Sequence, residues 1–152
     1  MKSIKRNIIV NILRKLKISF LKIYYARGSV SEIALGAAIG AFWGVFPTFG
    51  LSTILSLLLY KVIRFNLPVA ISAAFISNPL TSPFLLIISY KVGKLFINTD
   101  IQFEYETWHQ NISKIGYVLL VGSTIVSTIT AFLVYFIVKY AVLYRRKKSL
   151  YK

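Results

Sequence analysis

Few side chains in this sequence could carry out chemistry. The chain has one histidine, His109, four acids and no cysteine. Asp100, Glu104 and Glu106 share a polar stretch with His109, whereas Glu32 stands at the start of an apolar run. An enzyme needs a positioned acid, base, nucleophile or metal. We therefore expect no catalytic residue, no metal site and no cofactor, and the lack of cysteine excludes disulfide and thiolate chemistry.

Two breaks in otherwise apolar sequence bring other polar groups together with prolines. Broken helices aim backbone N–H groups and half-helix dipoles at one point, a geometry that membrane carriers use to hold anionic or polar groups. The sequence predicts a polar substrate site at Pro47, Thr48, Asn66, Asn78, Pro79, Thr81 and Ser82. The alternative is that these hydroxyl and amide groups only satisfy the broken backbone.

The apolar runs that carry these breaks are long. Hydrophobic residues make up 57% of the chain, and no charged residue occurs within 33–60, 65–90 or 115–138. Each of these stretches exceeds the roughly 20 residues that cross a hydrocarbon core. A soluble helix of this length would need a charged or polar face toward water. The pattern favours a protein of the membrane over a soluble one.

The basic residues cluster at the two ends of the chain. The net charge is +15, with eight of the nineteen basic residues before Ser31 and five more in 145–152. Such clusters beside membrane segments follow the positive-inside bias and attract anionic lipid. We therefore expect membrane lipids, and not nucleic acid, as partners, and we place both termini in the cytoplasm.

Residues 1–28 form a basic amphipathic segment without the features of a cleavable signal peptide. At 100° per residue its larger apolar side chains share one helical face: Ile8, Ile9, Ile12, Leu13, Leu16, Phe20 and Ile23. An apolar stripe with a basic opposite face is typical of a helix that lies at the membrane surface. An ordinary packed amphipathic helix is the alternative.

Residues 29–97 read as a membrane core of two helix-proline-helix units. Ser29 and Glu32 form a capping box, which predicts a helix from about Val30. Within that helix, Gly36, Gly40 and Gly44 recur every four residues and should let another helix approach closely. Pro47 and Gly50 should then end the helix.

Further helices follow the first break. The pattern predicts helices over Leu51–Val62, over Leu67–Ser77 with Asn66 as N-cap, and to about Ile97 with Ser82 as N-cap. Both units end in Tyr-Lys-Val, at Tyr60 and at Tyr90. This similarity indicates either an internal duplication or two hairpins of similar composition.

The rest of the chain divides into a polar loop and a final span. Residues 98–114 contain three of the four acids, and residues 115–152 contain an apolar helix, expected over Ile115–Tyr144, and a basic tail. Hydroxyls at Ser123, Thr124, Ser127 and Thr128 should bond the preceding turn or a neighbouring helix.

These motifs resemble the bacterial family of domains of unknown function numbered 2062. The resemblance covers about residues 29–97. It rests on the glycines from Gly36 to Gly50, on Arg64-x-Asn66-x-Pro68, on Asn78-Pro79-x-Thr81-x-Pro83 and on Gly93. It implies a small bacterial inner-membrane protein without an established activity. Some relatives appear joined to glycosyltransferase-like domains, which points to the cell envelope by association only.

The predicted fold is all-α: a polytopic helical membrane protein with proline-broken or re-entrant helices and an N-terminal interfacial helix. Two functions remain open. One is transport or handling of a lipid-linked or anionic polar substrate at the broken helices. The other is a non-catalytic scaffold or partner of a cell-envelope enzyme such as a glycosyltransferase. Either could act as a homo-oligomer in the bacterial inner membrane.

Overall fold

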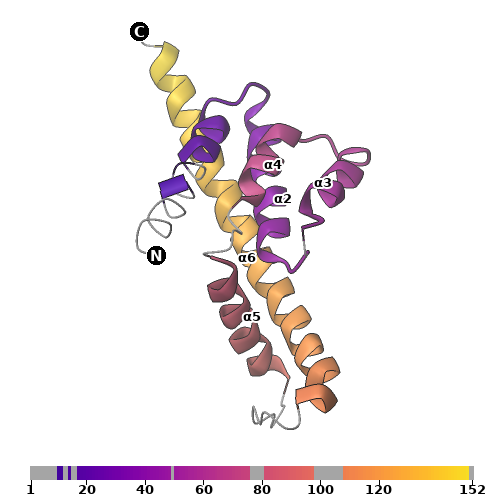
Figure 1. The fold of residues 1–152 in the computed structure, drawn as a ribbon. Helices are drawn as coiled ribbons and strands as arrows, with labels where there is room; N and C mark the ends of the chain where they lie inside the picture. The colour runs from indigo at the N-terminus through magenta and orange to yellow at the C-terminus, as the bar shows by residue number, and fades with distance from the viewer. Residues whose placement is uncertain are drawn as a thin grey trace.

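The computed structural model is helical and contains no strand among the residues it describes (Figure 1). The all-α prediction is confirmed for this part of the chain. The described residues are 10–11, 14, 17–48, 50–75, 81–97 and 108–150, with the backbone alone for 108–112 and 149–150.

Helix α2 (Val30–Val45) begins and ends where local chemistry requires it. Glu32 N donates to Ser29 Oγ at 3.1 Å, and Ser29 N donates to the Glu32 carboxylate at 3.0 Å. The predicted capping box is therefore confirmed. At the other end, Phe46 is extended (φ −64°, ψ 138°) because the residue before a proline avoids the α region. Gly50 then adopts a positive φ of 90° that favours glycine.

The next three helices are close to their predicted ranges. Helix α3 (Ser52–Tyr60) is shorter than Leu51–Val62. Helix α4 (Leu67–Ala74) has its predicted N-cap, since Asn66 Oδ1 accepts from Val69 N at 3.1 Å; its end falls short of Ser77, and residues 76–80 lie outside the described part.

Helix α5 (Ser82–Phe96) corrects one prediction, because its N-cap is Thr81 and not Ser82. Pro83 is tolerated with this earlier start. It becomes the second residue of the helix, where its missing N–H costs no hydrogen bond because the N–H groups of the first turn have no partner inside the helix.

Helix α6 (Trp108–Leu150) has 43 residues and is longer than the predicted span. It would measure about 64 Å at 1.5 Å per residue. Residues 108–114 are helical and not part of the polar loop, and no glycine or proline stands among them to stop the helix. At the other end the run of Arg and Lys continues the helix, since these residues are good helix formers and favour a C-terminus.

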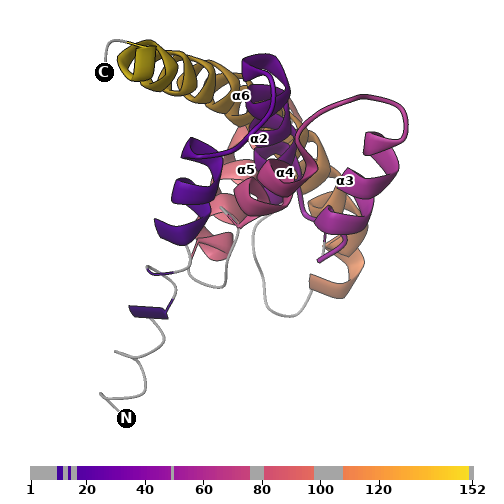
Figure 2. The ribbon, with the colours of Figure 1, turned by 90° about the horizontal axis from the view of Figure 1, so that it is seen from above.

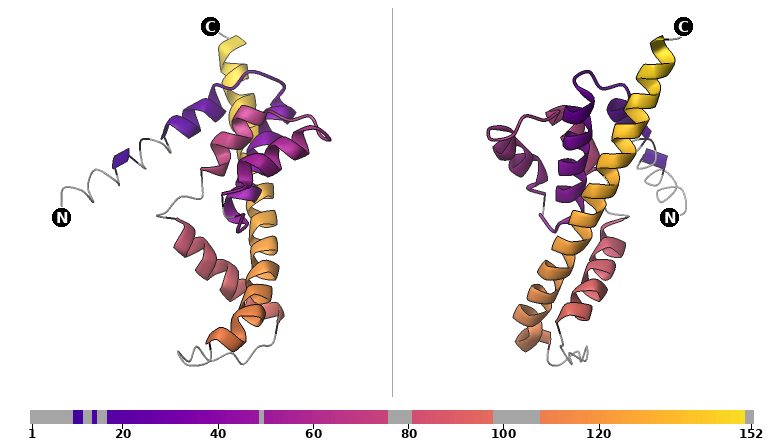
Figure 3. Two further views of the ribbon diagram at one scale, coloured as in Figure 1. Left: turned by 45° about the vertical axis from the view of Figure 1, so that its right-hand side comes forward. Right: turned by 180° about the vertical axis from the view of Figure 1, so that it is seen from behind.

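Helix α6 is the element on which the others pack. Helices α2 and α4 pack together, and α2 lies on the C-terminal half of α6, where the core contains Ile33, Val69 and Val142. Helix α5 packs along the N-terminal half of α6 (Figures 1 and 3). The two proline units differ in course: α3 turns back beside α2, whereas α5 continues away from α4 (Figure 1).

The N-terminal segment is helical over residues 17–24 and lies on the opposite side of α2 and α4 from α3 (Figure 2). On its predicted apolar face, Ile23 packs against the core and Phe20 is 65% exposed. The other members of that face, Ile8, Ile9, Ile12, Leu13 and Leu16, lie outside the described residues.

The surface of α6 is apolar over most of its length. By length and composition, Ser113–Lys148 is the one helix among the described residues able to cross a membrane, and only 22% of its most apolar window is buried inside the chain. Its large exposed side chains include Leu120, Ile129, Phe132, Leu133, Phe136 and Ile137. A continuous apolar surface of this kind is rare on a soluble monomer, and it supports membrane association.

Candidate site at the helix breaks

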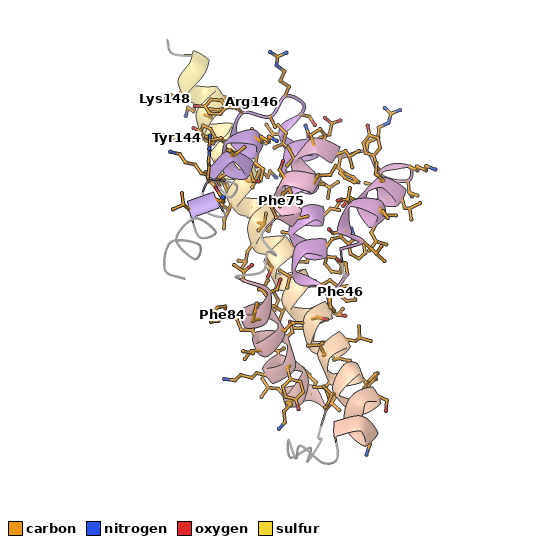
Figure 4. All side chains as sticks on the ribbon, viewed as in Figure 1. Phe46, Phe75, Phe84, Tyr144, Arg146 and Lys148 are labelled. Carbon is orange, nitrogen blue, oxygen red and sulfur yellow. The ribbon has the colours of Figure 1, made fainter. Side chains whose placement is uncertain are left out.

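A cavity of about 270 Å³ lies where α2 ends and where α3 and α5 begin; we call it the break cavity. Its lining residues include Trp43, Pro47, Thr48, Ser52, Ala74 and Ser82. Figure 4 places Phe46, another lining residue, at the lower end of α2, close to the region where α5 starts. Residues from both proline units thus meet around one space.

Two helix N-termini reach this cavity, and neither is capped by the side chain of its own N-cap residue. At α3 the N-cap is Leu51 and at α5 it is Thr81, and neither side chain accepts a hydrogen bond from the first turn. The first amide N–H groups of a helix have no partner inside the helix, and together with the helix dipole they favour negative charge. The cavity can therefore attract an anion or an electronegative oxygen.

Thr48 has a backbone role in the same place. Its hydroxyl donates to the Trp43 carbonyl at 3.4 Å, its N–H donates to Phe46 O at 2.7 Å, and its carbonyl accepts from Leu51 N at 2.9 Å. These bonds satisfy the open end of α2 and shape the turn into α3. Thr48 thus fits the alternative in which polar groups only satisfy broken backbone.

The structure brings some of the predicted site residues together and not others. Pro47, Thr48 and Ser82 line the break cavity, and Thr81 precedes Ser82 at the start of α5. Asn78 and Pro79 lie outside the described residues.

Asn66 lies at the far end of α4, away from the break cavity. Besides capping α4, its Nδ2 donates to Arg27 O at 2.7 Å, and its backbone N donates to Glu32 O at 2.9 Å. Asn66 therefore fastens the start of α4 to the start of α2.

The three glycines of α2 face the backbone of α4. A Cβ added at Gly36 would overlap Asn66 O, and one at Gly40 would overlap Ala70 O and lie 2.8 Å from Ala73 Cβ. At Gly44 it would lie 3.0 Å from Ala74 O. The helix that approaches this ridge is thus α4 of the same chain, and the contact holds α2 and α4 together above the break cavity.

Comparison with known families gives a match over residues 13–150 to the family described as "Uncharacterized protein conserved in bacteria (DUF2062)". The chain belongs to this family. No curated protein and no solved structure matches it.

The DUF2062 match extends beyond the segment that carries the sequence resemblance. That resemblance covers about residues 29–97, whereas the match also includes part of the N-terminal basic segment and all of α6. This range agrees with the packing, because α2 and α5 both rest on α6. The family unit therefore contains the helix that supports the break cavity.

A second close helix crossing, between α5 and α6, was missed by sequence reasoning. A Cβ added at Gly122 would overlap Ser89 O, and one at Gly93 would overlap Val118 O. The signal was present, because Ser89 and Gly93 are small residues four positions apart on one helix.

The predicted hydroxyl bonds of α6 are found within the helix: Ser123 and Thr124 donate to Leu120 O at 3.1 and 2.7 Å. Ser127 and Thr128 donate likewise to Thr124 O.

Basic and aromatic side chains join the N-terminal segment to the end of α6. The Arg145 guanidinium lies 5.5 Å from the ring centre of Tyr24 and 5.7 Å from that of Tyr25, and it donates to Tyr24 O. Arg146 donates to Gly28 O. The start of the family unit and its last helix thus meet at one basic end of the molecule.

Glu32 is the one acid among the described residues, and it belongs to this basic end. The Ser29 backbone N–H bond to its carboxylate is the main cause that holds the pKa of Glu32 below its ordinary value, helped by the Ser29 side chain and Arg64. The carboxylate is therefore engaged in capping α2.

Proposed function

We propose that this DUF2062 protein binds the anionic or polar headgroup of a lipid-linked substrate in the break cavity, as part of its transport or handling. The observation that carries the proposal is that two helices, α3 and α5, begin at one cavity of about 270 Å³. Fixed amide groups at helix starts hold anions without a positively charged side chain.

The charge pattern supports an anionic ligand. No acid of the described part of the chain lies near the break cavity, since Glu32 is committed to the Ser29 cap. A negative group entering the cavity would meet helix dipoles and hydroxyls and no carboxylate from these residues. In the low dielectric of a membrane such interactions are stronger than in water.

We further propose a multi-pass arrangement in the bacterial inner membrane. Helices α2 and α3 would form a re-entrant hairpin, α4 and α5 a broken span, and α6 the return span. Arg27, Arg64 and Arg146 would lie at the cytoplasmic end, and Figure 4 shows Arg146 and Lys148 at that same end of the fold. The excess of basic residues there follows the positive-inside bias, despite Lys91 and Lys94 on the other side.

A charge placed in the cavity tests the headgroup site. Ser52→Asp puts a carboxylate in the first turn of α3, where it suits the helix dipole and should preserve folding. Purified protein should bind dihexanoyl phosphatidic acid more tightly than dihexanoylglycerol, and Ser52→Asp should weaken the phosphatidic acid affinity by roughly tenfold or more. Isothermal titration calorimetry in a neutral detergent measures both.

Ser52→Asn is the matched control, because it is close in size to Asp and carries no charge. It should keep most of the affinity. Equal affinities for the two lipids, or equal losses in Asp and Asn variants, would contradict a headgroup site. That result would favour the scaffold function, in which the polar groups at the breaks only satisfy the backbone. The Thr48 hydroxyl acts in this way when it donates to Trp43 O.

A further inference from the structure

An apolar groove lies beside the break cavity on the surface formed by α2, α3 and α6. Its volume is about 550 Å³, and its walls include Leu35, Ile39, Phe42, Leu59, Ala131 and Phe132. We call it the side groove. Its size falls within the usual range of roughly 300–1,000 Å³ for sites that take a small organic ligand.

Trp43 connects the side groove to the break cavity, because it lines both of them. Its ring stands edge-on to the stacked rings of Phe42 and Phe46, with centroid distances of 4.9 and 6.2 Å. Its indole Nε1 is buried and has no hydrogen-bond partner within the described part of the chain. A tryptophan at the boundary of an apolar and a polar space matches the place where a lipid chain joins its headgroup.

We infer that the side groove and the break cavity together hold one phospholipid: an acyl chain along α2 and α6, and its phosphate at the starts of α3 and α5. This inference rests on the proposed function, since the phosphate occupies the proposed headgroup site. It adds that the substrate is recognised by its chain as well as by its charge. It also makes the side groove an entry route from the bilayer.

A lipid fits this pair of sites better than a second copy of the chain. The break cavity favours an anionic group, and Glu32 is occupied by its own capping box. The other three acids of the chain belong to the polar stretch of the sequence, which has no long apolar run to fill the side groove. The side groove is walled by side chains such as Phe42, Phe132 and Phe136, and in a bilayer it opens toward lipid chains. A phospholipid supplies both the apolar chain and the negative charge in one molecule.

Native mass spectrometry of the detergent-purified protein can separate the chain from the headgroup. The protein is mixed with dioleoyl phosphatidic acid, with dihexanoyl phosphatidic acid and with dioleoylglycerol. The long-chain phosphatidic acid should bind roughly fivefold more tightly than the short one, the equivalent of about 1 kcal/mol of packing in the groove. It should also bind more tightly than dioleoylglycerol, which has the chains without the phosphate.

Ala131→Phe fills the side groove without a change of charge, and Ile129→Phe, at an α6 side chain that is 55% exposed and outside the groove, is the control. Ala131→Phe should remove the advantage of the long chain and leave the short-chain affinity unchanged, whereas Ile129→Phe should change neither. An unchanged long-chain advantage in Ala131→Phe, or an equal loss in Ile129→Phe, overturns the inference. Loss of a dimer in Ala131→Phe with lipid binding intact also overturns it and assigns the groove to a second copy.

A measurement on the otherwise unaltered protein covers the case in which Ala131→Phe does not fold. The chain has two tryptophans, so Trp108→Phe leaves Trp43 as the sole indole. Phosphatidic acid brominated on its acyl chains should then quench Trp43 fluorescence, and excess unbrominated phosphatidic acid should reverse the quenching. Absence of quenching would contradict the assignment of the acyl chain to the side groove. The headgroup proposal fails separately, if the short-chain phosphatidic acid does not bind at all.

Discussion

Glycines in this protein differ in what surrounds them, and the difference decides what a side chain would do at each. A Cβ at Gly40 would overlap the Ala70 carbonyl oxygen of α4, whereas one at Gly116 in α6 would have nothing within 4 Å. Both lie inside helices, so the backbone cost of glycine is similar at the two positions. The two sites therefore isolate the effect of helix packing.

Gly40→Ala should destabilise the folded protein by about 2 kcal/mol, because α2 and α4 would have to move apart or strain. Gly116→Ala should instead stabilise it by about 0.5–1 kcal/mol, because alanine loses less backbone entropy in a helix. Thermal unfolding in detergent, followed by circular dichroism, compares the two variants with the unaltered protein. Equal midpoints for Gly40→Ala and the unaltered protein would show that α2 and α4 are not in close contact.

The sequence also showed which single residues break helices, but not which side chains surround the breaks. Pro47 acts on its own neighbours, so its effect on Phe46 could be predicted from the chain alone. Trp43 lies in a plain apolar run, and its place between two cavities depends on where α3 and α6 pack. From the sequence, Asn66 could be either the N-cap of α4 or a ligand-binding group. Its place at the end of α4 away from the break cavity decides for the cap.

At the scale of elements, helix starts were more predictable than helix partners. The starts of α2 and α4 depend on a few adjacent residues, such as Ser29 with Glu32 and Asn66 with Val69. The extent of α6 depends on the absence of a breaker and was underestimated, because the apolar stretch is shorter than the helix. The glycines of α2, spaced four residues apart, indicate that another helix approaches closely, but they do not show which helix it is.

The capping box at the start of α2 predicts a pH dependence. The pKa of Glu32 is lowered in the folded state, chiefly by the Ser29 N–H bond. A group with a depressed pKa stabilises the fold above its unfolded value, here about 4.5, and this contribution is lost as pH falls through the folded pKa. Glu32→Gln removes the charge at every pH, so it provides the reference.

The unaltered protein should therefore unfold at a higher temperature than Glu32→Gln at pH 7, and the two should converge as the pH falls below about 4.5. Thermal unfolding across this pH range measures the difference. Ser113→Ala in α6 is a control away from the cap, and its difference from the unaltered protein should not vary with pH in this way. A gap between Glu32→Gln and the unaltered protein that stays constant down to low pH would rule out the carboxylate bond as its source.

At the scale of the whole molecule, charged residues gather at the two ends of the fold and leave the middle of α6 without charge. Arg27, Arg145 and Arg146 lie at one end, together with Arg64, whose charge acts on Glu32. Asn66 Nδ2 donates to Arg27 O there, Arg145 donates to Tyr24 O, and Arg146 donates to Gly28 O. Lys91 and Lys94, near the end of α5, and Lys114, near the start of α6, lie at the other end. Between them, the charge-free part of α6, residues 115–138, would measure about 36 Å, enough for a core of about 30 Å.

This separation predicts how the chain reacts with a membrane-impermeant thiol reagent. Because the natural chain has no cysteine, single cysteines at Ser3, Gln102 and Ser149 report only on their own positions. In intact cells stripped of their outer membrane, only the cysteine at Gln102 should be labelled, because the proposed arrangement has both termini in the cytoplasm. All three should be labelled after the inner membrane is permeabilised, which serves as the control. Labelling of Ser149→Cys in intact cells would reverse the orientation of α6. Labelling at none of the three positions would mean that the acidic segment does not cross, and α5 with the start of α6 would then have to be placed on the cytoplasmic side.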